Sequence, residues 1–329
     1  MFQELLDSCE GEKSIILGNG FGISFDVAMR QDNFNWGSLL DLCEIEDGSF
    51  LHHVLSENKF DFELVHQKLN NTIDILNLYE PSSPLITQFE QQIQFLREQL
   101  VIAVSASHPP SFVRPRTHSE HEELNVRISN CRRFLNGFEM VFSLNYDLLL
   151  YWIRCHRTPM LGRDSFTRVD DDLVFSPNDN ANFFFPHGAL FIYRDGVSAI
   201  KSGSSRENPI LARLEANIEN GKFPMCISEG TGNQKLTEIK KNHYLLYSYN
   251  KIKESSGTLF TFGCSFLDGK DSHIIEAMCR SRASRIVVGE YQPNAVARLR
   301  LEHEFARVQA DIGTNKPVLI ADSEGASIW

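Results

Sequence analysis

The chain opens with a short apolar run that ends in glycine. Residues Lys13–Leu17 read KSIIL, and the segment GNGFG follows at residues 18–22. A run of this length that closes on glycine is typical of a buried strand entering a tight turn, and the pattern after the turn is helical. We therefore predict a strand, a glycine turn and a helix in this first part of the chain.

A helical period replaces the strand pattern from about residue 36 to residue 136. Apolar side chains there recur every three or four residues. They are Phe60, Leu64, Val65, Leu69, Ile73 and Leu76, and again Phe89, Ile93, Leu96 and Leu100. Prolines and charges interrupt the period at residues 107–123, SHPPSFVRPRTHSEHEE, where we predict a surface loop or lid. The region as a whole is predicted to be a large helical insertion after the first strand.

Strand patterns resume at about residue 138. Five runs have this character: FEMVFSLNYD, NFFFPHG, GTLFTFGCS, SRIVVGEY and KPVLIAD. Helical patterns separate several of them, at residues 235–253, 272–282 and 294–304. Strands that alternate with helices predict an α/β fold with a doubly wound, mostly parallel, Rossmann-like sheet. We expect residues 1–329 to form a single domain, with the helical insertion covering one side of the strand ends.

Composition narrows the classes of partner. The formal net charge is −11, which disfavours a general nucleic-acid surface because neutralising phosphates requires clustered Lys and Arg. The seven cysteines are scattered, with no Cys-x-x-Cys pair among them, and no apolar run approaches the length of a membrane span. These features predict a soluble protein of the cytoplasm, with no membrane partner and no strong nucleic-acid signal.

Four predicted strands end in residues that carry chemistry. In an open parallel sheet the ligand crevice lies beyond the carboxyl ends of the strands. The four ends hold Gly18 and Gly20, Asn145 and Asp147, His187 and Gly188, and Gly263 and Ser265. Each also has a purely structural interpretation, since glycine forms tight turns, Asn and Asp cap helices, and a lone histidine is usually structural. Asp268 or Asp271 is a further candidate cap, and the G-x-G-x-x-G fingerprint is not met because position 23 is Ile.

In this order, the four ends resemble the signatures of the sirtuin-like NAD-binding superfamily. Sirtuins carry Gly-Ala-Gly-x-Ser on the first strand, then Asn-Ile-Asp, a catalytic histidine before glycine, and a later Gly-Thr-Ser. This chain has Gly18-Asn19-Gly20-Phe21, Asn145-Tyr146-Asp147, His187-Gly188 and Gly263-Cys264-Ser265. The likeness is greatest to a bacterial branch of unknown function that also carries Ser-Glu-Gly-Thr, here Ser228–Thr231, followed by Lys235 and Leu236. It spans about residues 13–280, and the helical insertion is its least specific part.

The resemblance implies an NAD-consuming enzyme and a role for each motif. His187 would act as general base with a pKa near working pH, Asn145 would position the ribose or the attacking water, and Asp147 would orient the site or offset positive charge. The wall that holds NAD would comprise Gly18, Asn19, Gly20, Phe21, Ser24, Gly263 and Ser265. Zinc-free bacterial domains of this kind are often NAD hydrolases that deplete the cofactor during phage infection. The resemblance therefore implies antiviral defence, with a homo-oligomer or a partner subunit of a defence system.

The cysteine pattern separates this chain from sirtuin deacetylases. Deacetylation goes with a zinc ribbon of four cysteines in two close pairs, which this sequence lacks, so we expect NAD as the substrate and no zinc. His118 and His121, in HSEH, have the spacing of two metal ligands on a helix, but an exposed polar loop explains them better. Two alternatives to hydrolysis remain open: a nucleotide-binding sensor that does not cleave NAD, and an ADP-ribosyl transferase.

Overall fold

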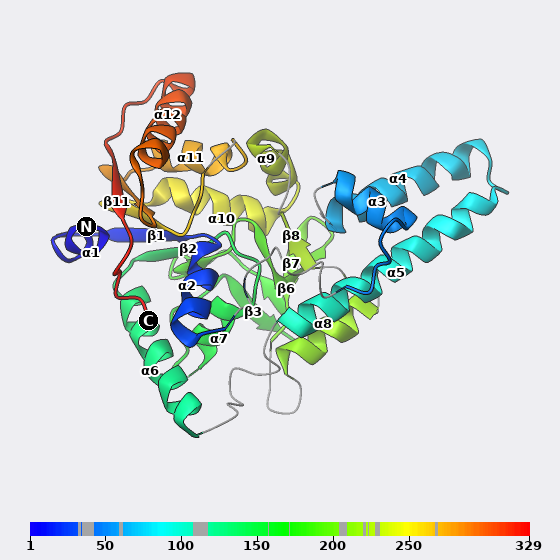
Figure 1. The fold of residues 1–329 in the computed structure, drawn as a ribbon, viewed down its shortest axis with the longest axis horizontal. Coiled ribbons are helices and arrows are strands. Elements are labelled where there is room, and N and C mark those ends of the chain that lie inside the picture. The colour runs from blue at the N-terminus through cyan, green and yellow to red at the C-terminus, as the bar shows by residue number, and fades with distance from the viewer. Residues whose placement is uncertain are drawn as a thin grey trace.

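A computed structural model gives the fold of the chain (Figure 1). It describes residues 1–31, 34, 43–58, 62–107, 118–156, 158–170, 172–203, 209–219, 222, 224–227, 231–266 and 269–329. Two sheets, one parallel and one antiparallel, make up the centre of the molecule. None of the described helices is both long enough and apolar enough to cross a bilayer.

The larger sheet is parallel and has the strand order β11-β10-β9-β1-β2-β5. Its strands are β1 (Lys13–Leu17), β2 (Met140–Ser143), β5 (Phe183–Phe184), β9 (Thr258–Phe262), β10 (Arg285–Glu290) and β11 (Val318–Asp322). β1 lies at the centre, with Ile15 beside Val141 of β2 and Phe260 of β9. All six predicted strands are present, and the prediction of an α/β fold with a parallel sheet is confirmed.

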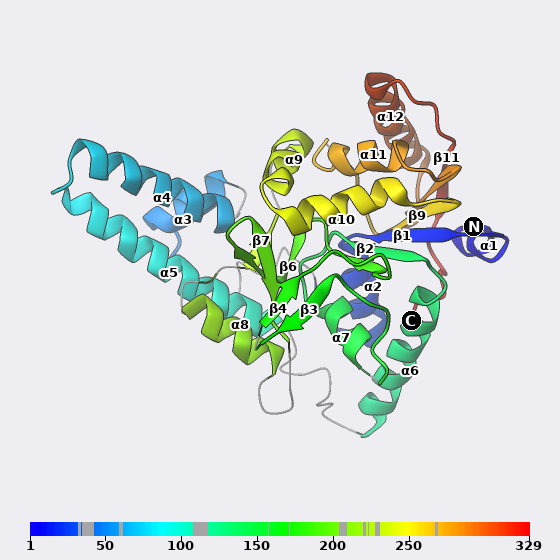
Figure 2. The same ribbon diagram turned by 180° about the vertical axis from the view of Figure 1, so that it is seen from behind.

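Helices lie on both sides of the parallel sheet (Figures 1 and 2). On one side are α9 (Gly232–Lys240), α10 (His243–Glu254), α11 (Ser272–Cys279) and α12 (Ala295–Ile312), and on the other α2 (Gly20–Met29), α6 (His118–Leu135) and α7 (Leu149–Cys155). α1 (Phe2–Asp7) packs Phe2 against Phe260 of β9. Strand residues such as Ile16, Phe142 and Val287 are fully buried, as expected between two layers of helices.

One predicted helix is in fact two. The pattern over residues 235–253 predicts a continuous helix, but the chain breaks at Lys241 and Asn242, between α9 and α10. The buried Asn242 side chain accepts hydrogen bonds from the backbone N–H groups of Tyr244 and Leu245, at 3.0 and 3.3 Å. An Asn in this position caps a new helix, and the apolar period alone does not reveal it.

The second sheet is antiparallel and was not predicted. Its order is β3-β4-β7-β6-β8, with β3 (Phe166–Val169), β4 (Asp172–Phe175), β6 (Gly188–Asp195), β7 (Ser198–Lys201) and β8 (Pro224–Cys226). The prediction of one mostly parallel sheet is wrong here, because short hairpin strands such as β3, with three of four residues exposed, carry a weak hydrophobic pattern. The chain passes from β5 directly to β6, so residues 185–187 link the two sheets.

The predicted helical insertion is present and has a small core of its own. α3 (Phe50–Glu57), α4 (Phe62–Tyr79) and α5 (Pro84–Ser107) bury Leu51, Leu55, Val65, Leu69, Ile93 and Leu96. α4 and α5 extend away from the sheets as a hairpin (Figure 1), and α8 (Ile210–Glu219) packs beside α5. The predicted loop at 107–123 ends earlier than expected because α6 begins at His118, and residues 108–117 lie outside the described part of the chain.

Candidate functional site

A cavity of about 960 Å³ lies at the C-terminal ends of β1, β2, β9 and β10. Most of the predicted site residues line it: Gly18, Asn19, Gly20, Ser24, Asn145, His187, Gly263 and Ser265. Phe21 and Asp147 do not. The described residues of the helical insertion do not line it either, although we expected the insertion to cover these strand ends. The cavity therefore combines strand ends from both sides of β1.

The glycines of the first loop are required by a contact with the loop after β9. Gly18 donates its backbone N–H to the Phe262 carbonyl and Gly20 donates to the Gly263 carbonyl, both at 2.9 Å. A Cβ on Gly20 would lie 2.6 Å from Gly263 Cα, and Gly263 itself has a φ of +69° that favours glycine. The glycine pattern thus has a structural cause, while the same backbone forms one wall of the cavity.

Asn145 joins the end of β2 to the glycine loop. Its side chain is 7% exposed and donates from Nδ2 to the Gly18 carbonyl, at 3.0 Å. This bond fixes the orientation of the amide, so the oxygen is the atom that Asn145 can offer to a ligand in the cavity.

Asp147 caps a helix instead of facing the cavity. Its carboxylate is 3% exposed, and Oδ1 accepts a hydrogen bond from the Leu149 N–H at 2.8 Å, at the start of α7. Burial raises the pKa of Asp147 to about 6, against the effect of the Leu149 hydrogen bond. The structure therefore supports the capping interpretation, and the catalytic role predicted for Asp147 is not retained.

Phe21 and Ser24 are engaged with an aromatic side chain from a distant part of the chain. Phe21 is 1% exposed, and its ring centroid lies 4.9 Å from that of Trp329. Ser24 donates from Oγ to the Phe21 carbonyl and accepts from Trp329 Nε1, both at 2.8 Å. Phe21 is thus a core residue, which corrects its predicted contact with NAD. Ser24 does line the cavity, but its hydroxyl anchors Trp329, which also lines it.

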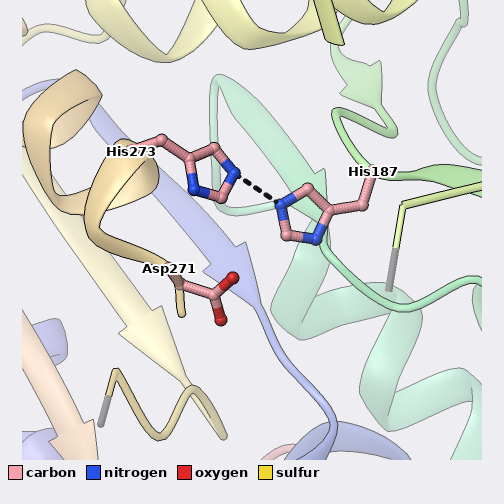
Figure 3. A group of neighbouring side chains, drawn as sticks. All are labelled: His187, Asp271 and His273. Carbon is pink, nitrogen blue, oxygen red and sulfur yellow. Dashed lines mark hydrogen bonds between the residues drawn. The ribbon is translucent and has the colours of Figure 1, made fainter. Parts of the chain in front are cut away.

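His187 forms a buried pair with His273, a residue that the sequence did not single out (Figure 3). The two Nε2 atoms lie 2.9 Å apart, and the side chains are 4% and 2% exposed. Burial lowers the pKa of His187 to about 4, although the nearby Asp271 carboxylate opposes the shift. Burial and the neighbouring His187 ring lower the pKa of His273 as well. Both rings are therefore neutral at neutral pH, and the expected pKa near working pH is wrong for this buried site.

Asp271 lies beside the two rings and pairs with a lysine. It occupies the N-cap position of α11, but its Oδ1 accepts from Lys235 Nζ at 2.9 Å instead of capping the helix. Burial would raise the pKa of Asp271, but its electrostatic interactions with His187 and with the Lys235 ammonium hold it below its usual value. The second candidate cap, Asp268, lies outside the described residues. The site thus holds a negative charge next to the neutral imidazole of His187.

The same three side chains have the composition of a metal site. Each side chain offers one ligand atom, and these three atoms, from His187, Asp271 and His273, lie within 4.8 Å of one another. Two imidazoles and a carboxylate can bind Zn²⁺, which would have to displace the Lys235 ammonium from Asp271. None of the seven cysteines forms a disulfide bond. The side chains of His118 and His121, in α6, lie outside the described residues.

Sequence reasoning missed His273 and the ion pair of Lys235 with Asp271. His273 follows Asp271 by two residues at the start of α11, and its only sequence signal is this Asp-x-His spacing near a glycine-rich strand end. Of the resembling segment Ser228–Thr231, residues 228–230 lie outside the described part of the chain. Thr231 caps α9 and accepts a hydrogen bond from the Gln234 N–H, which helps to place the buried Lys235.

A comparison with protein families accounts for nearly the whole chain. Residues 15–329 match the model of a domain of unknown function, DUF4917. The chain belongs to the DUF4917 family. The match covers both sheets except the first two residues of β1, and it includes every residue that lines the cavity, so the His187 and His273 pair lies within the DUF4917 domain. No curated protein matches the chain.

Proposed function

We propose that this protein consumes NAD by hydrolysing the bond between nicotinamide and ribose. The topology of the sheet supports the proposal. Numbered in chain order, the parallel strands lie in the order 3-2-1-4-5-6, which is the order of Rossmann-like dinucleotide-binding sheets. Dinucleotides bind such sheets at the point where the strand order reverses. Here that point is between β1 and β9, where the loops of Gly18 and Gly263 meet beneath the cavity.

The volume of the cavity is compatible with this ligand. At about 960 Å³ it is near the upper end of the range for small-molecule sites, as a dinucleotide requires. The side chains of Ile23 and Val27 offer apolar surface, and Asn145, His187 and Ser265 offer polar groups. We therefore assign the loop of Gly18 and Gly20 to the phosphates, and the side of Asn145 and His187 to the nicotinamide ribose.

The proposed chemistry uses few groups. The bond from ribose C1′ to the nicotinamide nitrogen breaks, and nicotinamide leaves with the electron pair. Water then attacks the oxocarbenium-like carbon, and its proton passes to a base, which yields ADP-ribose. His187 is the base in this scheme, since its ring is neutral at neutral pH and carries a nitrogen lone pair that can accept the proton. Asp271 would stabilise the resulting imidazolium, and His273 holds the ring in position.

The single observation that carries the proposal is the neutral His187 ring in the wall of a cavity at the strand-order reversal. The test is incubation of the purified protein with NAD labelled in the adenylate part, followed by chromatography. Nicotinamide with free labelled ADP-ribose supports hydrolysis, whereas label on protein indicates ADP-ribosyl transfer. Binding of NAD without cleavage indicates a sensor, and the absence of binding overturns the proposal.

A role in bacterial antiviral defence is part of the same proposal and rests on the resemblance to zinc-free sirtuin-like domains. An enzyme that drains NAD must be silent at rest, so its activity is also to be measured in infected cells. The cellular NAD concentration should fall after phage infection in cells that carry the parent protein. It should not fall in cells that carry His187→Ala, which controls for the effect of infection itself. Equal NAD concentrations in the two strains would contradict a defence role.

A further inference from the structure

A second cavity, of about 360 Å³, is lined by residues of the antiparallel sheet and of α8. Figure 2 shows α8 next to this sheet. Four basic side chains line it, from four different segments: Arg168 of β3, Lys201 of β7, Arg213 of α8 and Lys222. Among the described residues, Asp172 is the one acidic residue in its lining. An excess of positive charge in one small cavity contrasts with the net charge of −11 of the whole chain.

The charge of Lys201 belongs to a buried cluster with an excess of positive charge. Lys201 Nζ lies 2.6 Å from Asp164 Oδ2, and Arg154 also donates to this oxygen, at 3.0 Å. The side chains of Lys201, Asp164 and Arg154 are 8%, 6% and 2% exposed, so water does little to screen their charges. One carboxylate therefore serves two cations, and the floor of the cavity keeps a positive charge.

Two further polar groups in the lining are available for hydrogen bonds to a ligand. Arg213 Nε is buried and has no hydrogen-bond partner among the described residues. The Tyr193 hydroxyl, in a residue that is 2% exposed, lies close to Asn217 and Ser202, whose side chains bond to each other at 3.0 Å. The lining thus holds a hydroxyl, an amide, guanidinium groups and ammonium groups. Donors of these kinds recognise phosphate oxygens.

We propose that this cationic pocket binds a small phosphorylated molecule, at most about the size of a nucleoside monophosphate. The volume lies near the lower limit for small-molecule sites and is too small for a dinucleotide. Arg213 and Lys222 bind the phosphate oxygens from the open side, and the Tyr193 hydroxyl binds from the floor. The pocket is separate from the cavity of His187, since Tyr193 lies six residues further along β6, roughly 20 Å at the rise of a strand. The proposal does not depend on NAD cleavage.

Inorganic pyrophosphate is the probe for the test, with calorimetry at low ionic strength. The parent should bind it, and Arg213→Gln combined with Lys222→Gln should weaken binding by about tenfold or more. The matched control is Arg127→Gln with Lys241→Gln, which removes the same charges from α6 and from the turn after α9, away from both cavities, and should leave binding unchanged. Tyr193→Phe removes one hydroxyl from the floor and should weaken binding several-fold.

Hydrogen exchange locates the bound pyrophosphate, because the NAD cavity also offers phosphate contacts. Protection of α8 and β7 is expected in the parent and should be lost in the Arg213 and Lys222 double variant. Melting temperatures show that the variants fold, and Tyr193→Phe serves as the test if the double variant does not. Three outcomes would overturn the proposal: no binding of pyrophosphate at concentrations up to about 10 mM, equal binding by the double variant and its control, or protection confined to the loop of Gly18 and Gly20.

Discussion

The Nε2 atoms of His187 and His273 lie 2.9 Å apart, although His187 follows β5 and His273 lies in the first turn of α11. Both rings are buried, and their pKa values are lowered by that burial. The His187 ring also forms a hydrogen bond with the Leu144 backbone, and the tautomer that donates to Leu144 leaves the lone pair of the other ring nitrogen to accept a proton. A proton taken up by His187 would reach a ring that is already held by a partner and lies beside the Asp271 carboxylate.

Removal of the proposed base or of the ribose-positioning amide should stop turnover. We expect His187→Ala and Asn145→Ala each to lower the rate of nicotinamide release about 100-fold or more. Because the two residues serve one step, the double variant should be little worse than the poorer single variant. His303→Ala, an exposed histidine of α12, is the matched control. A destabilised His187→Ala protein that cleaves NAD at the parental rate would end the catalytic assignment.

The histidine pair should make the protein less stable in mild acid. His187 has a folded pKa of about 4 against an ordinary value of 6.5, so the unfolded chain binds more protons between these values. The free energy of unfolding should therefore fall as the pH drops from 6.5 towards 4. The raised pKa of Asp147 acts in the opposite direction. Between its ordinary pKa of 3.8 and its folded pKa of about 6 the folded chain binds more protons, so this residue lowers the free energy of unfolding as the pH rises.

A comparison of two proteins separates these contributions. His273→Gln keeps a hydrogen-bonding group beside His187 but removes one buried imidazole, while Asp147 is unchanged and cancels in the difference. Urea unfolding at pH 7 and at pH 4.5 should show a smaller loss of stability in His273→Gln than in the parent. An equal loss in the two proteins would mean that His273 does not titrate in this range.

Asp147 should prove to be a helix cap. Asp147→Asn keeps an oxygen that can accept the Leu149 N–H, so we expect parental folding and a rate of nicotinamide release within about threefold of the parent. Asp147→Ala removes the cap and should lower the free energy of unfolding by about 1 kcal/mol. Melting temperature and NAD cleavage are measured on both variants. A 100-fold slower but fully stable Asp147→Asn protein would restore the catalytic role.

Gly20 should tolerate no side chain, for reasons of packing. In Gly20→Ala the new Cβ would lie 2.6 Å from Gly263 Cα, so the two loops must separate, at a cost of about 1–3 kcal/mol. Gly137→Ala is the control, since its Cβ would lie close to one atom, the Phe134 carbonyl oxygen, at 3.2 Å. A loss of NAD binding in Gly20→Ala is therefore no test of the ligand site.

Ile23 gives the cleaner test of the phosphate position. This residue lines the cavity in the first turn of α2 and is 41% exposed, so Ile23→Glu should leave the fold intact. The added carboxylate should weaken NAD binding by about tenfold through repulsion of the phosphates, whereas Ile23→Gln should change it much less. Equal NAD affinity in the two variants would move the phosphates away from this helix.

Zinc should act as an inhibitor and not as a structural component. We expect less than about one zinc per chain in the purified protein, and no loss of activity with EDTA. Added Zn²⁺ should bind His187, His273 and Asp271 and block NAD cleavage, because it occupies the lone pair of the base. Calorimetry should show binding to Zn²⁺ that weakens at least about tenfold in Asp271→Asn, independently of any activity. A stoichiometric zinc that EDTA removes with loss of folding would contradict this view.

The sequence by itself determined the local elements and the residues at their ends. Apart from the edge strand β11, the strands of the parallel sheet are largely buried on both faces, so their apolar runs are visible without knowledge of their neighbours, as in Lys13–Leu17. For the same reason the polar residues after these strands, Asn145 and His187 among them, were recognised as candidates for one crevice. In the second sheet, β3 and β4 consist of exposed and half-buried residues, and their weak pattern concealed them.

Only the tertiary structure decided what each candidate touches. The contact of Gly20 with Gly263 joins residues that are distant in the chain, as does the pair of His187 with His273, and neither leaves a mark in the local pattern. The capping bond of Asp147 and the lowered pKa of His187 likewise depend on burial and on hydrogen bonds formed in the folded chain. Hydrophobic periodicity is set by neighbours a few residues apart, whereas the chemistry of a site is set by side chains that the fold brings together and removes from water.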